Sequence, residues 1–233
     1  MLIAFAAALL VALVPAAPPV AASSSGWPLA APDAAQAWRT TPVRDSLAHY
    51  YAQQQPAALA RLCERAQTRE DRLLCRYRLY PLTQDARYLR DIPSEQGVRS
   101  ARELALIAAL WAYRASTAPA WSVPTLGRRS ERILGQARSA DPNEPYVLLV
   151  EGQSLYYRPP AFGGNAREAQ RRFEQLQRAL RQRPSPGIHP FEADVWIWMA
   201  LRKTDRAAAE TRRRELLARR PPPLFRQFLI DPP

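Results

Sequence analysis

The residues that could take part in catalysis or metal binding are few and stand far apart in the chain. The sequence of 233 residues has two histidines, His49 and His189, and neither has a nucleophile or a group of carboxylates beside it. His189 precedes Glu192 by three positions, a spacing that could place a metal ion on one face of a helix. Because Pro190 follows His189, we favour a helix cap for this histidine, with Glu192 facing the positive end of the helix dipole.

Other catalytic motifs do not occur in the sequence. There is no Gly-x-Ser-x-Gly elbow, and Gly163-Gly164 lacks the preceding strand and the lysine of a phosphate-binding loop. Adjacent carboxylates such as Glu70-Asp71 lie on a predicted exposed helix and do not converge on a cleft. We therefore predict a protein that is not an enzyme and has no metal or cofactor. A hydrolase that uses His49 or His189 is the rival hypothesis.

The two cysteines, Cys63 and Cys75, are twelve positions apart. On one continuous helix they would be about 18 Å apart along the axis, too far for a disulfide. A break is predicted at Gln67-Thr68, with Thr68 as N-cap and Asp71 as its reciprocal partner. A helical hairpin with its turn there would place the cysteines on facing helices. We expect a disulfide if the chain is exported, and two buried thiols are the alternative.

A glycine-rich turn, residues 156–165, is the most distinctive local segment. Gly163-Gly164 permits a positive φ and a close approach of the backbone. Asn165 can cap the following helix, and Glu168 can complete a capping box. We expect Phe162 to fill the groove between the two helices that the turn joins. A structural role explains these residues, and a loop that contacts a ligand or partner is the alternative.

The composition indicates helices that would hold these residues in place. Ala, Arg, Leu, Gln and Glu dominate, glycine is scarce at 8 residues, and 23 prolines interrupt the chain. Apolar helices alternate with amphipathic ones at a period of roughly 40 residues, as in stacked helix pairs. The predicted helices span residues 41–55, 57–80 with a break at 67–68, 99–116, 125–139, 144–157, 165–183, 190–203, 205–220 and 224–230.

The N-terminus has a different composition. Leu2–Val14 is an uncharged apolar run of about 13 residues, which suits a signal peptide and is short for a membrane span. Small residues allow cleavage after Ala22, although a basic segment before the run is missing. A buried helix or a membrane anchor is the alternative. We expect a periplasmic or secreted protein that is not integral to the membrane. Its predicted parts are a signal peptide (1–22), a flexible linker (23–40), N-terminal helical hairpins (41–97) and helical repeats with a C-terminal capping helix (98–233).

The net charge is high, at +12, but it is dispersed along the sequence. All basic residues except Lys203 are arginines. The densest clusters, residues 212–214 and 219–220, stand beside Glu210 and Glu215 on a predicted helix, which favours a solvated face. We therefore predict no nucleic-acid partner, while acidic proteins and anionic lipid headgroups stay open as partners.

Three segments share one spacing of small and large apolar residues. In the clearest one, a first helix carries Gly152 between two leucines, and a second helix carries Phe173 four positions after an alanine. The residues that follow the pattern are Leu148, Gly152, Leu155, Ala169, Phe173, Leu176 and Pro184, then Ser130, Leu134, Ala137 and Pro142 upstream, and Trp196, Ala200, Ala209, Leu216 and Pro221 downstream. The pattern resembles the tetratricopeptide repeat. Arg213 departs from it where a large apolar residue is expected, as in a degenerate terminal repeat.

The turn over residues 156–165 also resembles the PxxFGG turn of a set of exported bacterial tetratricopeptide proteins. A more distant similarity is to the helical T-component of TRAP-type periplasmic solute transporters. The resemblance implies an all-α fold, an α-solenoid of stacked antiparallel hairpins, whose concave face binds a protein or peptide. We expect partner contacts from Tyr146, Tyr156, Arg158 and Phe162. The rival hypothesis is a small-molecule-binding component of an envelope transport system, in which the Phe162 turn closes over a ligand.

Overall fold

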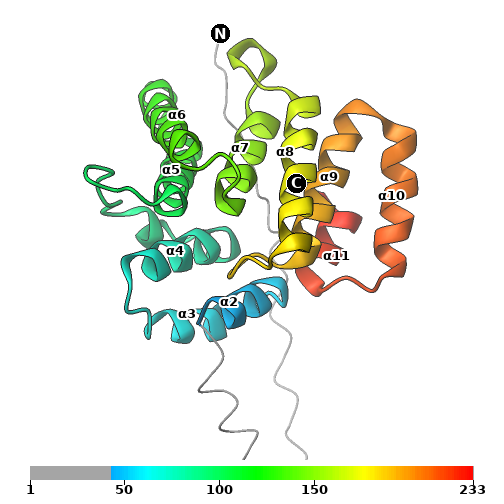
Figure 1. The fold of residues 1–233 in the computed structure, drawn as a ribbon, viewed down its shortest axis with the longest axis horizontal. Helices are drawn as coiled ribbons and strands as arrows, with labels where there is room; N and C mark the ends of the chain where they lie inside the picture. The colour runs from blue at the N-terminus through cyan, green and yellow to red at the C-terminus, as the bar shows by residue number, and fades with distance from the viewer. Residues whose placement is uncertain (1–42, 233) are drawn as a thin grey trace, which may run out of the picture.

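The computed structural model describes residues 43–232, and all regular secondary structure in this range is helical (Figure 1). The prediction of an all-α fold is confirmed. The expected signal peptide, its cleavage site, the linker and the Thr41–Pro42 helix start lie outside the described residues. The helices are α2 (Val43–Ala52), α3 (Pro56–Cys63), α4 (Arg69–Thr83), α5 (Ala101–Ser116), α6 (Val123–Ala140), α7 (Pro145–Tyr157), α8 (Ala166–Gln182), α9 (Pro190–Thr204), α10 (Arg206–Ala218) and α11 (Pro223–Ile230), with short 3-10 helices η1 (Ala86–Leu89) and η2 (Pro160–Phe162).

Local sequence signals set most of the helix starts. Six helices follow a residue whose side chain accepts a hydrogen bond from an N–H group of the first turn. These residues are Thr68, Ser100, Glu144, Asn165, His189 and Asp205. Helix α4 runs past its predicted end at Tyr80, because Pro81 stands near its C-terminal end and removes only one helical hydrogen bond. The chain leaves α4 at Gln84, which has a left-handed φ of 53°.

Three helix hairpins, α5–α6, α7–α8 and α9–α10, make up most of the fold. Helix α7 packs against α5, and α9 packs against α8. Figure 1 shows the three hairpin turns along one edge of the molecule. Ion pairs agree with this view: Arg158 after α7 contacts Glu131 in the first half of α6, whereas Glu151 in the middle of α7 contacts Arg138 near the end of α6. We call this edge, residues 112–131, 154–171 and 201–208, the hairpin-tip end.

Helix α4 covers the first helices of two hairpins. The ring of Tyr77 stacks on Tyr113 of α5 with centroids 5.7 Å apart, and it meets Tyr146 of α7 edge to face at 6.3 Å. A hydrogen bond of 3.0 Å joins the Tyr77 hydroxyl to the side-chain oxygen of Gln153 on α7. Tyr146, at the start of α7, is therefore covered by Tyr77 of α4 together with residues 186–187.

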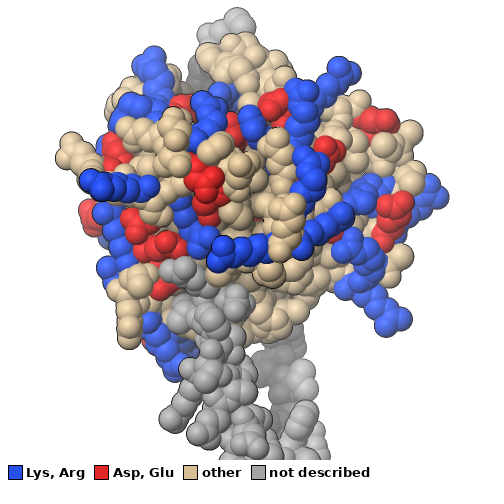
Figure 2. All heavy atoms as spheres, viewed as in Figure 1, with Lys and Arg blue, Asp and Glu red and all other residues tan. Residues whose placement is uncertain are grey.

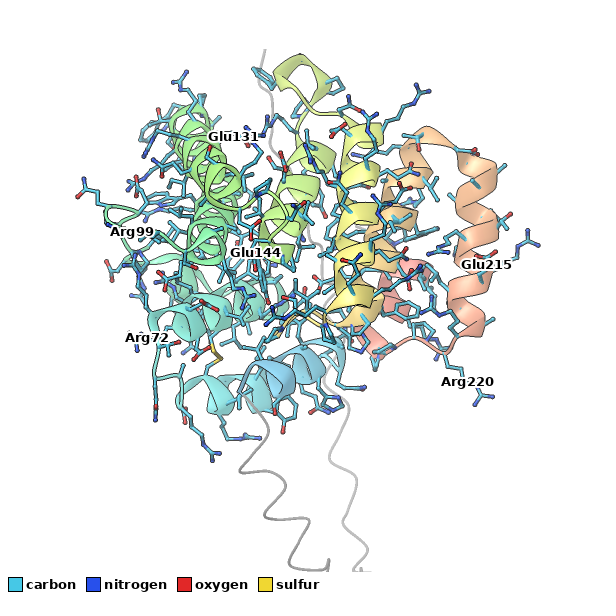
Figure 3. All side chains as sticks on the ribbon, viewed as in Figure 1. Arg72, Arg99, Glu131, Glu144, Glu215 and Arg220 are labelled. Carbon is cyan, nitrogen blue, oxygen red and sulfur yellow. A yellow bond between two sulfur atoms is a disulfide. The ribbon has the colours of Figure 1, made fainter. Side chains whose placement is uncertain are left out.

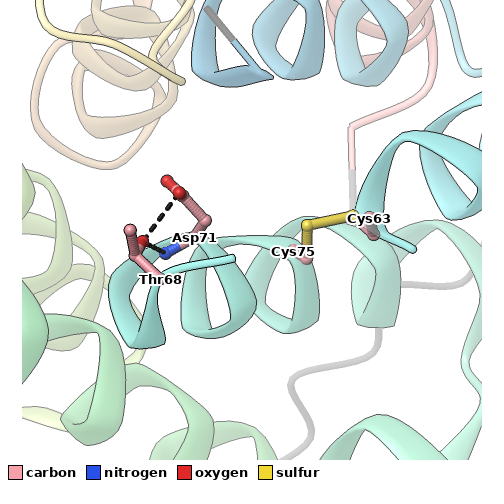
Figure 4. The surroundings of a disulfide bond; sticks show 4 residues. All are labelled: Cys63, Thr68, Asp71 and Cys75. Atoms are coloured by element: carbon pink, nitrogen blue, oxygen red, sulfur yellow. Dashed lines mark hydrogen bonds between the residues drawn. A yellow bond between two sulfur atoms is a disulfide. The ribbon is translucent and has the colours of Figure 1, made fainter. Parts of the chain in front are cut away.

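The predicted disulfide joins Cys63 at the end of α3 to Cys75 in α4, with Cα atoms 5.8 Å apart (Figure 4). The hairpin turns where the sequence predicts. Thr68 Oγ1 accepts a hydrogen bond from the backbone N–H of Asp71 at 3.0 Å and donates one to its carboxylate at 2.7 Å. This disulfide fastens α3 to α4.

The C-terminal helix α11 brings the two ends of the described chain together. It packs against α9 and against α2, and the side-chain amide of Gln54 donates to Gln227 of α11. Arg213, which departs from the repeat pattern, donates from Nε to the carbonyl oxygen of Leu229 in α11 at 2.6 Å. One continuous hydrophobic core runs from Leu47 to Leu229.

Candidate functional site

The turn between α7 and α8 is fixed by its own backbone. The N–H groups of Phe162 and Gly164 both donate to the carbonyl oxygen of Pro159, at 2.9 and 3.1 Å. Gly163 has a φ of 87°, in the left-handed region. A Cβ atom at position 164 would stand 1.7 Å from the carbonyl oxygen of Arg158, so that only glycine fits there. The turn therefore holds one conformation and presents its tip in a defined direction.

Phe162 stands at that tip and is 53% exposed. The prediction that it fills the groove between α7 and α8 is wrong. Phe173 occupies that space, because Gly152 lets the ring approach closely: a Cβ atom at position 152 would lie 2.4 Å from the Phe173 ring. Phe162 is consequently free to contact something outside the chain.

Tyr146 and Tyr156 do not reach the surface, so the prediction that they contact a partner is wrong. Tyr146 is fully buried, and its hydroxyl donates to the carbonyl oxygen of Pro186 at 3.1 Å. Tyr156 is also buried, and the ammonium group of Lys203 lies 3.7 Å from its ring centroid. Burial raises the pKa of both hydroxyls. Both tyrosines therefore belong to the core.

Arg158 ties the turn to the neighbouring hairpin. Its guanidinium group contacts the carboxylate of Glu131 on α6 and the hydroxyl of Ser154, which itself donates to Glu131 at 2.7 Å. Burial lowers the pKa of Arg158 from its ordinary value. Figure 3 places Glu131 between α6 and α7, which agrees with this bridging role. Arg158 thus supports the turn, and its guanidinium group is already engaged within the chain.

Asn165 caps α8 as predicted, since its side-chain oxygen accepts from the N–H groups of Arg167 and Glu168, both at 3.1 Å. The expected capping box is incomplete. The N–H of Asn165 donates to the carbonyl oxygen of Leu155 instead, and the carboxylate of Glu168 pairs with Arg171 and Arg172. The reason is that the chain crosses back over α7 at this point.

A shallow groove of about 590 Å³ lies between the segment before α5 and helix α6. The sequence reasoning missed it, because its two walls come from separate parts of the chain. Glu95 belongs to the wall formed by the segment before α5, and its carboxylate accepts hydrogen bonds from Arg132 at 2.5 Å and from Arg129 at 3.1 Å. The hydrogen bond from Arg132, with smaller contributions from its own backbone and from Arg129, lowers the pKa of Glu95 to about 2. The remaining lining residues are Gln96, Gly97, Val98, Arg99, Leu104, Gln136 and Ala140.

A buried ion pair, also missed, joins α4 to α9. Arg78 and Glu192 are 1% and 3% exposed, and their side chains form two hydrogen bonds of 2.7 and 2.8 Å. The guanidinium group also donates to the carbonyl oxygen of Gly187 at 2.8 Å and lies 4.4 Å from the centroid of the Tyr51 ring. Burial alone would lower the pKa of Arg78, but attraction to Glu192, together with smaller contributions from neighbouring tyrosines, outweighs it and raises the pKa. The contacts of this pair fit a structural role.

His189 caps α9 as predicted, since Nδ1 accepts from the N–H of Phe191 at 3.1 Å. Burial lowers the pKa of its imidazole below the ordinary value. Glu192 lies in the first turn of α9, as expected, and its carboxylate also pairs with Arg78. Within residues 43–232, no group of three or more His, Cys, Asp or Glu side chains is placed to hold a metal ion. In the same part of the chain, no helix combines the length and apolar character that crossing a bilayer requires.

Comparison with known proteins leaves the chain without an assigned relative. No family model, no curated protein and no solved structure matches its sequence or fold.

Proposed function

We propose that this protein is an exported, non-catalytic helical-repeat scaffold of the tetratricopeptide type that binds a protein or peptide segment. The observation that carries the proposal is the groove between residues 95–99 and α6. Its volume of about 590 Å³ is within the usual range of ligand pockets, roughly 300–1,000 Å³. The three helix hairpins and their repeat spacing support an α-solenoid, although α4 covers the face that first helices would line.

The side chains of the groove fit an acidic, extended peptide. Val98 and Leu104 offer apolar contacts, and the amides of Gln96 and Gln136 can bond to a peptide backbone. Arg132 and Arg99 bring two positive charges to the lining against the one negative charge of Glu95, which Arg129 also contacts from outside the lining. Because Glu95 holds two of these guanidinium groups, part of the site is pre-organised, which lowers the entropic cost of binding. Figure 3 places Arg99 at the outer side of the molecule, next to α5.

Selection of peptides from a random display library against the purified protein tests the binding site. We expect enriched sequences that carry Asp or Glu, and at least tenfold weaker binding to the Arg99→Glu variant, or about 1.4 kcal/mol. Arg214→Glu, an equal change of charge on the exposed face of α10, is the matched control and should bind normally. Peptides that bind wild type and Arg99→Glu equally well would remove the groove from the proposal.

Export is tested separately, by sequencing the N-terminus of the protein recovered from a bacterial envelope fraction. We expect the first residue to be Ser23, after cleavage at Ala22. Recovery of the full-length chain from the cytoplasm would contradict this part of the proposal and leave the groove untouched.

A further inference from the structure

Positive charge gathers at the hairpin-tip end. Residues 112–131, 154–171 and 201–208 hold nine basic and three acidic residues, a net charge of +6, which is half of the +12 of the whole chain. The three carboxylates are all engaged within the protein: Glu131 pairs with Arg158, Glu168 pairs with Arg171, and Asp205 caps α10. The fold thus concentrates charge that the sequence distributes evenly.

The same end carries exposed aromatic side chains. Among the described residues, three large apolar side chains are more than half exposed: Trp121 at 83%, Ile230 at 57% and Phe162 at 53%. Trp121 stands in the α5–α6 turn and Phe162 in the α7–α8 turn, and the helices of these two hairpins pack against each other. Figure 2 shows the α7–α8 turn as an uncharged knob with basic side chains on either side of it.

From this arrangement we infer that the hairpin-tip end docks onto a bilayer surface that contains anionic lipids. Trp121 and Phe162 enter the interfacial region, where aromatic rings are favoured. Exposed basic residues of the same end, Arg128, Arg167 and Arg206, contact lipid phosphates. Each basic residue near an anionic membrane strengthens binding about fivefold. The partner is thus a lipid surface, a target beyond the peptide of the proposed function.

The shape of this end favours a bilayer over other acidic partners. The aromatic rings stand on projecting turns, whereas single-stranded nucleic acid needs rings inside a basic groove on which bases can stack. Backbone hydrogen bonds hold the α7–α8 turn in a shape that Gly163 and Gly164 permit, so Phe162 is held out from the protein. Insertion into a fluid interface requires no complementary pocket for that ring, in contrast to a protein partner.

Flotation with lipid vesicles tests the inference on the full chain. Vesicles of equal parts phosphatidylglycerol and phosphatidylcholine should bind the protein, and vesicles of phosphatidylcholine alone should bind it at least tenfold more weakly. Salt at about 0.5 M, which shortens the screening length to roughly 4 Å, should weaken the binding. The double variant Trp121→Ser/Phe162→Ser should bind anionic vesicles at least tenfold more weakly than wild type, and so should Arg167→Glu/Arg206→Glu.

The matched control is Ile230→Ser/Arg214→Glu, which removes one exposed apolar side chain and reverses one charge outside the hairpin-tip end. It should bind vesicles as wild type does.

Circular dichroism and the thermal midpoint must show that every variant folds, and all variants share the same N-terminal segment. Equal vesicle binding by wild type and the tip variants would overturn the inference, and so would no binding by wild type. Loss of peptide binding in the tip variants, with vesicle binding intact, would instead assign this end to a protein partner. Arg99→Glu should leave vesicle binding unchanged, which separates this inference from the peptide groove.

Discussion

Removing the carboxylate of Glu192 should destabilise the fold severely. In Glu192→Gln, the guanidinium group of Arg78 stays 1% exposed in the core but loses its counter-ion and one of its charge-assisted hydrogen bonds. Breaking a buried ion pair from one side costs about 3–5 kcal/mol, because a charge is left uncompensated. Since domains are stable by roughly 5–15 kcal/mol, this single change removes a large part of the free energy of unfolding.

A double-mutant cycle measured by urea unfolding separates the pair from its surroundings. Arg78→Met should also cost about 3–5 kcal/mol. In the double variant Arg78→Met/Glu192→Met, the free energy of unfolding should fall by less than the sum of the two single decreases, by a margin of at least about 2 kcal/mol. The reason is that neither charge then stays buried without its partner. Glu210→Gln is the control: its carboxylate is 57% exposed beside Arg213, and its loss should change stability by at most about 0.5 kcal/mol.

Two outcomes would refute this reasoning. A loss below about 1 kcal/mol in Glu192→Gln would mean that water or another group solvates Arg78. Additive losses in the cycle would mean that Arg78 and Glu192 are not coupled across the contact between α4 and α9.

Three further predictions concern stability and use thermal or urea unfolding. Replacing Cys63 and Cys75 by serine should cost about 3 kcal/mol, the entropy of closing so short a loop, and reductant should affect the wild type alone. Gly164→Ala should cost about 1–3 kcal/mol, because its Cβ atom would clash with the carbonyl oxygen of Arg158. Gly135→Ala, in open space on α6, should instead stabilise the fold by about 0.5–1 kcal/mol, and equal effects of the two changes would contradict the turn geometry. Folding lowers the pKa of His189, so the folded protein favours the neutral imidazole. The contribution of His189 to the free energy of unfolding is therefore fully present above its ordinary pKa of 6.5 and is lost as the pH falls through its pKa in the folded protein. His189→Asn, which keeps a capping oxygen, should abolish that part of the pH dependence, and an unchanged profile would assign it to other groups.

Features that depend on a few neighbouring residues could be predicted from the sequence. Thr68 and Asp71 define a helix start by themselves, and that start places Cys63 and Cys75 on facing helices. The cap formed by Asn165 and the glycine turn before it are equally local. In each case the interacting atoms lie within about one helical turn of each other along the chain, or on the two arms of one hairpin.

Features that depend on how hairpins dock could not be predicted. Arg78 and Glu192 are separated by 114 positions, and one arginine among many carries no local sign that it is buried. The exposure of Tyr146 depends on α4, which the repeat pattern does not place. From the sequence, either Phe162 or Phe173 could fill the space between α7 and α8. The small size of Gly152 decides in favour of Phe173.

The position of α4 also decides where recognition can occur. To open the face of α7 that carries Tyr146, a ligand would have to displace α4, separate Arg78 from Glu192 and expose Leu73 and Leu74, which are 1% exposed. The ion pair alone would cost about 3–5 kcal/mol, and each leucine roughly 1.5–3 kcal/mol more. A micromolar ligand supplies about 8 kcal/mol in total, and that energy would be consumed by the opening. Binding to a surface that the fold already presents avoids this cost, which is why the groove beside α6 and the hairpin-tip end are the places where a partner should be sought.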